Sequence, residues 1–220
     1  MSTLATIVDK IYAENGGLMP VFSWIETEDI AENDYATGQK PTPWTPTPAQ
    51  VNMLVWINLV HGVKGINWFP GQFGNTPDYN YVEMHRIYLQ LTALTDVILG
   101  PDVGFAVSDN SNIEGNRVDT MVRKNGTDIW LFAVRLTEIS SSGVPEQNDI
   151  QTTFTIPNFG SGSVMVYDEG RSLSVSNGQF TDTFVPNAVH IYKISSNLGA
   201  SPSGGILESI INWIGNVIKG

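Results

Sequence analysis

Apolar side chains alternate between two spacings along the first hundred residues. In residues 3–15 they recur three or four positions apart, which predicts an amphipathic helix. Residues 21–25 form a short apolar run, as in a buried strand, and residues 63–69 repeat that pattern. Residues 79–98 return to helical spacing.

The helix predicted over residues 49–61 is apolar on nearly all sides, so we expect neighbours to cover both of its faces. Thr47 is placed to cap it, and Pro48 suits the first helical position. Strand, helix, strand and helix with short connections predict a parallel α/β sheet or barrel.

After Pro101 the pattern changes to short strands separated by turn residues. Residues 118–123 and 128–136 flank Asn125-Gly126, and this pair tolerates the positive φ of a type I′ turn, so we predict a hairpin. Further strands are predicted at residues 151–156, 163–167, 173–175, 179–184 and 189–194. Short strands at this spacing predict an antiparallel β-sandwich.

The predicted fold class is therefore α/β plus all-β. We expect a partial (β/α) barrel segment at 1–100, an antiparallel β-sandwich at 101–196, a flexible linker at 197–205 and an amphipathic helix at 206–220. The last helix is too short to cross a bilayer, and its polar face sets Lys219 against Glu208, which suits anionic lipid poorly. Self-association or docking onto a neighbour is favoured over a membrane role.

The amino-acid composition excludes some classes of binding partner and favours others. The net charge of −11 over 220 residues argues against nucleic acid, because binding phosphate requires clustered Lys and Arg. Only 15% of residues are charged, which suits a protein that interacts with neutral polymers such as glycans. Without cysteine there is no disulfide or thiolate chemistry, and no signal peptide pattern is visible. The composition favours an extracellular or virion-associated location.

Several segments resemble the last part of a TIM-barrel glycoside hydrolase. "PVFSWIE", "PTPAQVNMLVWINLVHGVKGINWF" and "LTDVILGPDV" correspond to barrel strand seven through helix eight. "DIWLFAVR", "SVMVYDEGRSL" and "GQFTDTFVPNAVHIYKI" are similar to the β-sandwich that commonly follows such barrels. The resemblance covers roughly residues 5–195.

The resemblance implies specific roles. Glu26 matches the catalytic nucleophile at the end of strand seven, and Trp68 matches a sugar-stacking platform at the end of strand eight. Trp24 and Asn67 join them as candidate substrate-binding residues. Barrel strands one to six have no counterpart here, and the acid/base carboxylate on strand four is missing with them.

Each of these residues also has a structural interpretation. Glycoside hydrolysis needs two carboxyls on opposite sides of the bond, whereas Glu28 and Asp29 share the loop of Glu26 and would approach from the same side. Glu26 can therefore be a strand-end acid that pairs with a base or water. Trp68 can be a core or interface residue, and Trp24 can be core.

Other chemistry finds no support. Trp56 is expected in the core and His61 at the end of its helix as a structural residue. The three histidines lie in separate elements without metal-ligand spacing, and no G-x-S-x-G, P-loop or G-x-G-x-x-G motif occurs. We expect no cofactor and no metal.

The sequence thus predicts a carbohydrate-active protein derived from a glycoside hydrolase, which hydrolyses or binds glycans and can need another chain to complete its site. Whether it is an enzyme stays open. The alternative is a non-catalytic structural or assembly protein, such as a virion or surface component, which oligomerises through the barrel fragment and the C-terminal helix. Expected partners are carbohydrate and a homo-oligomer or complementing chain, without nucleic acid and without a membrane.

Overall fold

The structure is a computed structural model that describes residues 3–28, 45–69, 76–103, 107–110, 117–137 and 148–195. Asp29 and the linker and helix predicted at 197–220 lie outside the described residues.

The first part of the chain is a mixed α/β arrangement, as the hydrophobic pattern predicted. Its elements are α1 (Thr3–Glu14), β1 (Phe22–Glu26), α2 (Pro48–Val60), β2 (Gly65–Phe69), α3 (Asp78–Ala93) and α4 (Thr95–Ile98). Strands β1 and β2 pair in parallel, in register from Phe22 opposite Gly65 to Glu26 opposite Phe69. The helix predicted over residues 79–98 is divided, because α3 ends at Ala93 and the short α4 follows.

Both ends of α2 follow from local sequence. The Thr47 hydroxyl accepts a hydrogen bond from the Gln50 amide at 3.3 Å, and the Gln50 side chain accepts one from the Thr47 amide at 2.8 Å. This capping box satisfies two amides that a helix start leaves unpaired. His61 caps the other end, where its amide donates to the carbonyl of Ile57 at 3.1 Å.

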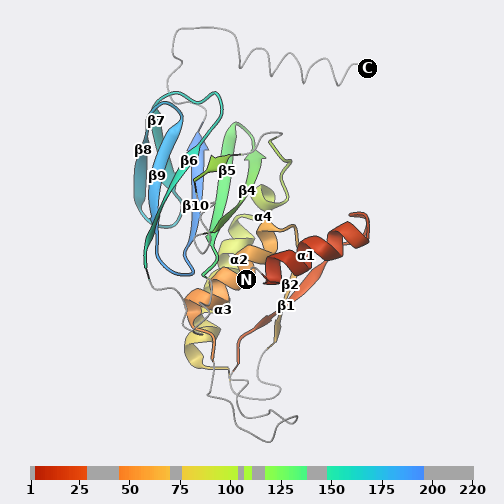
Figure 1. The fold of residues 1–220 in the computed structure, drawn as a ribbon. Coiled ribbons are helices and arrows are strands. Elements are labelled where there is room, and N and C mark those ends of the chain that lie inside the picture. The colour runs from red at the N-terminus through yellow and green to blue at the C-terminus, as the bar shows by residue number, and fades with distance from the viewer. Residues whose placement is uncertain are drawn as a thin grey trace, which may run out of the picture.

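Helix α2 lies between the strand pair and the antiparallel sheets (Figure 1). Helix α3 is a further neighbour, and Trp56 contacts two of these elements: its ring stacks on Phe132 of β5 at 5.4 Å, while its indole nitrogen donates to Gln90 of α3 at 3.2 Å. Val51, Val55 and Ile57 are also fully buried. The prediction that α2 is covered on two sides is confirmed.

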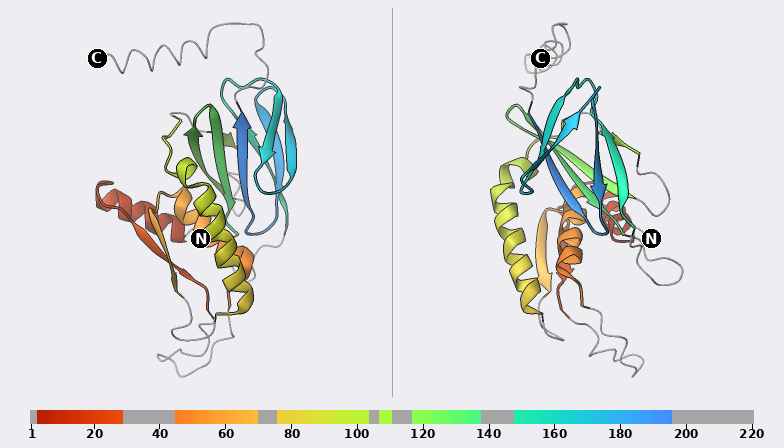
Figure 2. Two further views of the ribbon diagram at one scale, coloured as in Figure 1. Left: turned by 180° about the vertical axis from the view of Figure 1, so that it is seen from behind. Right: turned by 90° about the vertical axis from the view of Figure 1, so that its left-hand side faces the viewer.

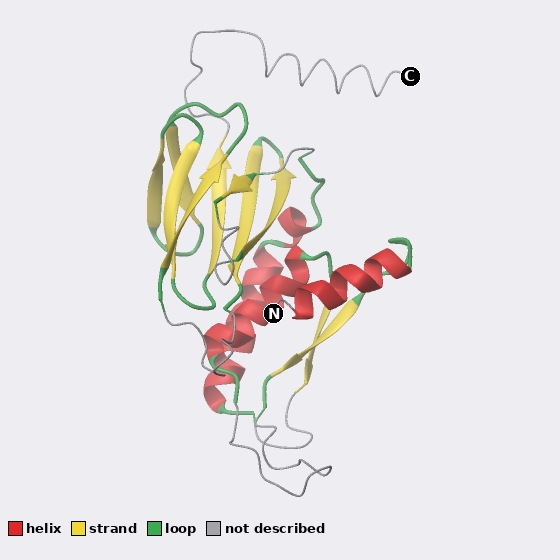
Figure 3. Cartoon of the chain, in the orientation of Figure 1, coloured by secondary structure: helices red, strands yellow, loops and turns green. Residues whose placement is uncertain are grey.

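The second part of the chain is antiparallel. Its strands are β3 (Ser108–Asp109), β4 (Val118–Asn125), β5 (Asp128–Arg135), β6 (Ile150–Thr155), β7 (Gly162–Val166), β8 (Arg171–Val175), β9 (Gln179–Phe184) and β10 (Val189–Ser195). A five-stranded sheet has the order β4-β5-β10-β7-β8, and a three-stranded sheet has the order β3-β6-β9. Figure 3 shows the strands in yellow and the helices in red.

The two antiparallel sheets face each other across a second core (Figure 2). Phe154 and Phe180 of the smaller sheet stack at 5.1 Å, and Tyr192 of the larger sheet meets the ring of Phe180 at 5.0 Å. The opposite face of the larger sheet packs on α2 through Phe132 and Val134. The larger sheet therefore contributes to both cores.

The two Asn-Gly turns differ. At the β4–β5 hairpin, Asn125 pairs with Asp128, so Gly126 and Thr127 are the central residues, and only Gly126 has a positive φ, at 59°. That pattern fits a type II′ turn, so the predicted type I′ turn is wrong here. The type I′ pattern occurs instead in the turn before β9, where Asn177 and Gly178 both have positive φ.

His61 also joins three elements through its side chain. Its Nδ1 lies 2.7 Å from Asp9 of α1, and its Nε2 lies 2.9 Å from Asp119 of β4. Asp119 additionally accepts a hydrogen bond from Arg117. Burial opposes protonation of His61, but the hydrogen bonds to Asp119 and Asp9 outweigh burial and raise its pKa above the usual value. The expected structural role of His61 fits this geometry.

We predict that His61 makes stability pH-dependent. Because the folded-state pKa is raised, protonated His61 stabilises the fold fully below its unfolded pKa of about 6.5, and the contribution is lost as pH rises through the folded-state pKa. His61→Gln should lower the free energy of unfolding by ~1.5 kcal/mol at about pH 5.5 and by less at about pH 9. Urea unfolding at both pH values measures this.

The matched control is His85→Gln, because His85 is exposed on α3 and faces Tyr88 rather than a carboxylate. This control should change stability by under about 0.5 kcal/mol at either pH. An equal loss from His61→Gln at both pH values would contradict the role of the charged imidazole.

Candidate functional site

One face of the β1–β2 pair gathers three of the four candidate residues. Side chains alternate along a strand, and paired residues of neighbouring strands point to the same face. The register sets Trp24 beside Asn67 and Glu26 beside Phe69. These three candidates and Phe69 therefore share one face. Trp24 is 66% exposed, and its ring meets the Phe69 ring edge-on at 6.1 Å. We call Trp24, Glu26, Asn67 and Phe69 the open face.

Trp68 lies on the other side of the pair. It is paired with Ile25, which is 1% exposed, and it packs against the core around α2. The structure therefore does not bring Trp68 together with Glu26. Trp24, for which a core position was the alternative, is exposed, whereas Trp56 is buried as expected.

The carboxylate of Glu26 is held at the end of β1 by the backbone that follows it. Its Oε1 accepts hydrogen bonds from the amides of Thr27 and Glu28, each at 2.9 Å. Glu26 thus pairs with backbone amides, where the structural interpretation named a base or water. Its side chain is half-buried, so the carboxylate lies at the boundary between the fold and the open face.

Four polar residues near the ends of β1 and β2 are buried: Thr27, Glu28, Thr76 and Asn80. The Thr27 hydroxyl donates to the Phe69 carbonyl at 3.0 Å and lies 3.4 Å from the Thr76 hydroxyl. Asn80, in the first turn of α3, donates to the Thr27 carbonyl at 3.0 Å. Burying polar groups is costly unless they are paired, and a paired network of this kind holds its members in one arrangement.

Sequence reasoning missed most of this buried polar cluster. Glu28 was noticed as one of several acids after β1, but no spacing links Thr27 to Thr76 and Asn80, which follow about fifty residues later. The only available signal was general: polar residues that follow parallel strands meet at one edge of a sheet.

Glycoside hydrolysis would need a second carboxylate opposite Glu26. Glu28 is fully buried and belongs to the segment directly after β1, and Asp29 lies outside the described residues. Strands β1 and β2 themselves carry Glu26 as their only acid. Within the described residues, no group of three or more His, Asp or Glu side chains could hold a metal ion. No described helix is long and apolar enough to span a membrane.

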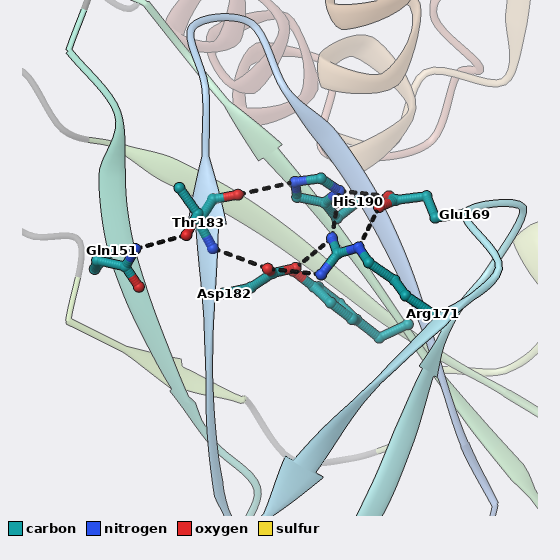
Figure 4. Close-up of polar contacts among 7 residues, drawn as sticks. Gln151, Glu169, Arg171, Asp182, Thr183 and His190 are labelled. Atoms are coloured by element: carbon teal, nitrogen blue, oxygen red, sulfur yellow. Dashed lines mark hydrogen bonds and ion pairs between the residues drawn. The ribbon is translucent and has the colours of Figure 1, made fainter.

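A separate cluster of charged groups joins β8, β9 and β10 (Figure 4). Arg171 forms two hydrogen bonds to the carboxylate of Asp182, at 2.8 and 2.7 Å, and one to Glu169 at 2.7 Å. Tyr192 donates to Asp182 at 2.8 Å, and His190 lies 2.5 Å from Glu169. We call these five residues the Arg171 cluster.

Charge pairing inside the Arg171 cluster shifts the pKa values of its members. Burial raises the pKa of Asp182, but hydrogen bonds from Arg171, Tyr192 and the Thr183 amide outweigh burial and lower the pKa overall. Burial raises the pKa of Tyr192, and the neighbouring Asp182 adds to that shift. Asp182 lies on the smaller sheet, and Arg171 and Tyr192, which donate to it, lie on the larger one, so the cluster ties the two antiparallel sheets together. With the Thr183 amide, three protein donors satisfy this carboxylate. We therefore treat the cluster as structural.

Solved structures show what this chain is similar to. An α-amylase from Geobacillus thermoleovorans, in complex with acarbose, matches with a TM-score of 0.54 at 8% identity, over 86% of this chain and 42% of its own. An Anoxybacillus α-amylase matches with a TM-score of 0.50 at 10% identity, over 89% of this chain and 46% of its own. A GH30 endoxylanase from Clostridium papyrosolvens matches with a TM-score of 0.43 at 14% identity, over 86% of this chain and 46% of its own.

No protein-family model matches the sequence, and no curated protein matches it. The structural similarity to glycoside hydrolases, which the sequence motifs implied, is confirmed. At these identities the similarity is one of fold. The chain spans less than half the length of the structures that it matches, so it corresponds to a part of them.

We predict that the Arg171 cluster is a main support of the antiparallel sheets. Because the folded-state pKa of Asp182 is lowered, its contribution is present above the unfolded pKa of about 3.9 and is lost as pH falls through the folded-state pKa. Asp182→Asn should lower the free energy of unfolding by ~3 kcal/mol near neutral pH, because it leaves the Arg171 charge without its main partner. Chemical denaturation measures the loss.

Glu169→Gln is the matched control, because Glu169 pairs with the same guanidinium from a more exposed position. Its cost should stay at about 1 kcal/mol or less. If Asp182→Asn costs no more than Glu169→Gln, the buried carboxylate is not the anchor of the cluster.

Proposed function

We propose that this chain is a glycan-binding protein of glycoside-hydrolase descent, and that it acts through the open face of β1 and β2. In this proposal the α/β part corresponds to the last two βα units of a (β/α) barrel. The antiparallel sheets correspond to the β-sandwich that follows such barrels. The observation that carries the proposal is the open face itself, where the exposed ring of Trp24 lies on the same side of the strand pair as Glu26 and Asn67.

The chemistry of the open face suits sugars. An exposed indole ring packs on the apolar face of a pyranose, and Trp24 is held against Phe69 by an edge-on contact. Glu26 and Asn67 supply acceptors and donors for hydroxyl groups. The face carries no Lys or Arg, and the chain as a whole is acidic, so uncharged glycans are favoured over anionic ones.

Hydrolysis requires more than these residues supply. Two carboxyl groups must flank the glycosidic bond, roughly 5 Å apart for retention or 6.5–9.5 Å apart for inversion. The open face contributes one, Glu26. We therefore propose that the described residues bind glycans, and that any turnover depends on an opposing carboxylate from outside the described residues, in this chain or in another.

Glycan binding by the open face is testable with soluble neutral polysaccharides such as amylose, xylan and β-glucan. We expect Trp24→Ala to weaken binding roughly tenfold, about 1.4 kcal/mol, because it removes the stacking ring. Glu26→Gln should weaken binding less, because an amide keeps an acceptor. Affinity electrophoresis or isothermal titration measures the change.

Tyr88→Ala is the control for losing an exposed aromatic ring, since Tyr88 lies on α3, outside the open face, and is 60% exposed. It should leave the affinity unchanged. Equal losses from Trp24→Ala and Tyr88→Ala, or no binding of any of these glycans by the unmodified chain, would overturn the proposal.

A second candidate function is assembly. Large apolar side chains gather before and on β1, with Leu18 88% exposed, Met19 65% and Phe22 60%. A two-stranded sheet is marginal by itself, and parallel sheets are normally covered on both faces. Such a surface favours contact with another copy or a complementing chain, as in a structural component of a virion or surface array. The helical pattern at 206–220 would add a second contact.

Assembly through β1 predicts a specific response to mutation. The unmodified chain should sediment as an oligomer at micromolar concentration, and Phe22→Ser combined with Met19→Ser should shift it toward the monomer, because both changes remove apolar contact area. Leu89→Ser is the control, since Leu89 is 54% exposed on α3. A monomer in the unmodified chain excludes assembly and leaves glycan binding in place.

A further inference from the structure

Asn80 joins three segments at the edge where the open face ends. It belongs to the first turn of α3 and is fully buried. Its side-chain amide donates one hydrogen bond to the carbonyl of Thr27, at 3.0 Å, and another to the carbonyl of Pro46, at 2.9 Å. One amide group therefore ties the end of β1 to the start of α2 and to α3.

Thr27 connects Asn80 to the open face through hydrogen bonds. Its carbonyl is held by Asn80, and its hydroxyl donates to the carbonyl of Phe69 at 3.0 Å. Its amide donates to Oε1 of Glu26 at 2.9 Å. Every polar group of Thr27 is thus engaged, and two of the three contacts lead directly to residues of the open face.

Glu26 receives its orientation from the same backbone. The amides of Thr27 and Glu28 point at a single carboxylate oxygen, so the position of this short segment decides where the carboxylate lies. A hydrogen bond tolerates only a few tenths of an ångström in distance, and it weakens steeply when bent. Movement of the Thr27 carbonyl therefore displaces Glu26.

Asn80 uses only part of its own hydrogen-bonding capacity. Its Oδ1 is buried and has no hydrogen-bond partner among the described residues. A buried polar group costs free energy when unpaired, and an apolar residue in place of Asn80 would also remove the donor to the carbonyls of Thr27 and Pro46. Asparagine at this position is explained by the two carbonyls that it orients.

We propose that Asn80 is a positioning residue of the open face, which acts through Thr27 on the carboxylate of Glu26. The role in ligand binding rests on the proposed glycan-binding function, whereas the effect on the position of Glu26 does not. A positioning role and a merely structural joint differ in their consequences. Positioning makes the effects of Asn80 and Glu26 depend on each other, while a structural joint lowers overall stability independently of Glu26.

The test uses two pairs of variants. Asn80→Asp is isosteric but replaces the donating amide with an oxygen that faces two carbonyls, and Asn80→Ala removes the group. Thr27→Val removes the hydroxyl that bonds to Phe69, while Thr27→Ser retains it as the matched control. Thr27→Val and Thr27→Ser keep the proposal testable where a change at Asn80 prevents folding.

The first measurement is amide hydrogen exchange, which needs no ligand. Asn80→Asp and Thr27→Val should speed exchange at the amides of Thr27 and Glu28 at least about tenfold, while exchange in the core of α2 and in β5 stays unchanged. Thr27→Ser should resemble the unmodified chain. Unchanged exchange at Thr27 and Glu28, or uniformly faster exchange throughout the chain, would overturn the positioning role.

The second measurement is affinity for the soluble neutral glycan bound best, in the unmodified and Glu26→Ala backgrounds, because alanine removes the group that Asn80 is proposed to position. Asn80→Asp should weaken binding severalfold, and no more than Glu26→Ala does, when Glu26 is present, and by less than about twofold in Glu26→Ala. An equal loss in both backgrounds would mean that Asn80 does not act through Glu26. If the unmodified chain binds no glycan, the proposed function fails, and the exchange result alone then decides whether Asn80 positions Glu26.

Discussion

The burial of α2 between the strand pair and the five-stranded sheet is the interaction on which the rest of the structure depends. A helix that is apolar on nearly all sides is stable only when neighbours cover both faces, and each large side chain that is fully buried stabilises the fold by roughly 1.5–3 kcal/mol. Trp56 stacks on Phe132 and bonds to Gln90, so it joins the two parts of the chain directly. The α/β part and the antiparallel sheets share one core as a result.

The position of the open face follows from that packing. Because α2 and the core around it cover Ile25 and Trp68, the alternation of a strand places Trp24, Glu26 and their neighbours on β2 on the opposite side. Parallel pairing then brings the ends of β1 and β2 to one edge, where α3 begins and supplies Asn80. A catalytic or binding role for Glu26 is thus compatible with the fold, and a stacking role for Trp68 on the same face is not supported by the geometry.

The few basic side chains of this protein include two that connect separate elements of the fold. The chain has 11 Lys and Arg against 22 Asp and Glu, so its cations are few. Arg171 neutralises the buried Asp182 between the two sheets, and His61 connects Asp9 of α1 to Asp119 of β4. Both sites hold separate elements together. The open face carries no basic side chain, which leaves it acidic and suited to an uncharged ligand.

The sequence by itself determined the order and type of nearly every described element, because the spacing of apolar residues and the capping and turn residues act over a few positions. It predicted the double burial of α2 and the structural role of His61. It also placed Trp24, Glu26 and Asn67 on neighbouring strands. Only the tertiary structure decided that Trp68 faces the core, because strand register sets the face of each residue and depends on what α2 covers. The same holds for Thr27, Thr76 and Asn80. About fifty residues of chain separate Thr27 from the other two, and only the parallel pairing of β1 with β2 and the start of α3 beside it bring Thr76 and Asn80 into contact with Thr27.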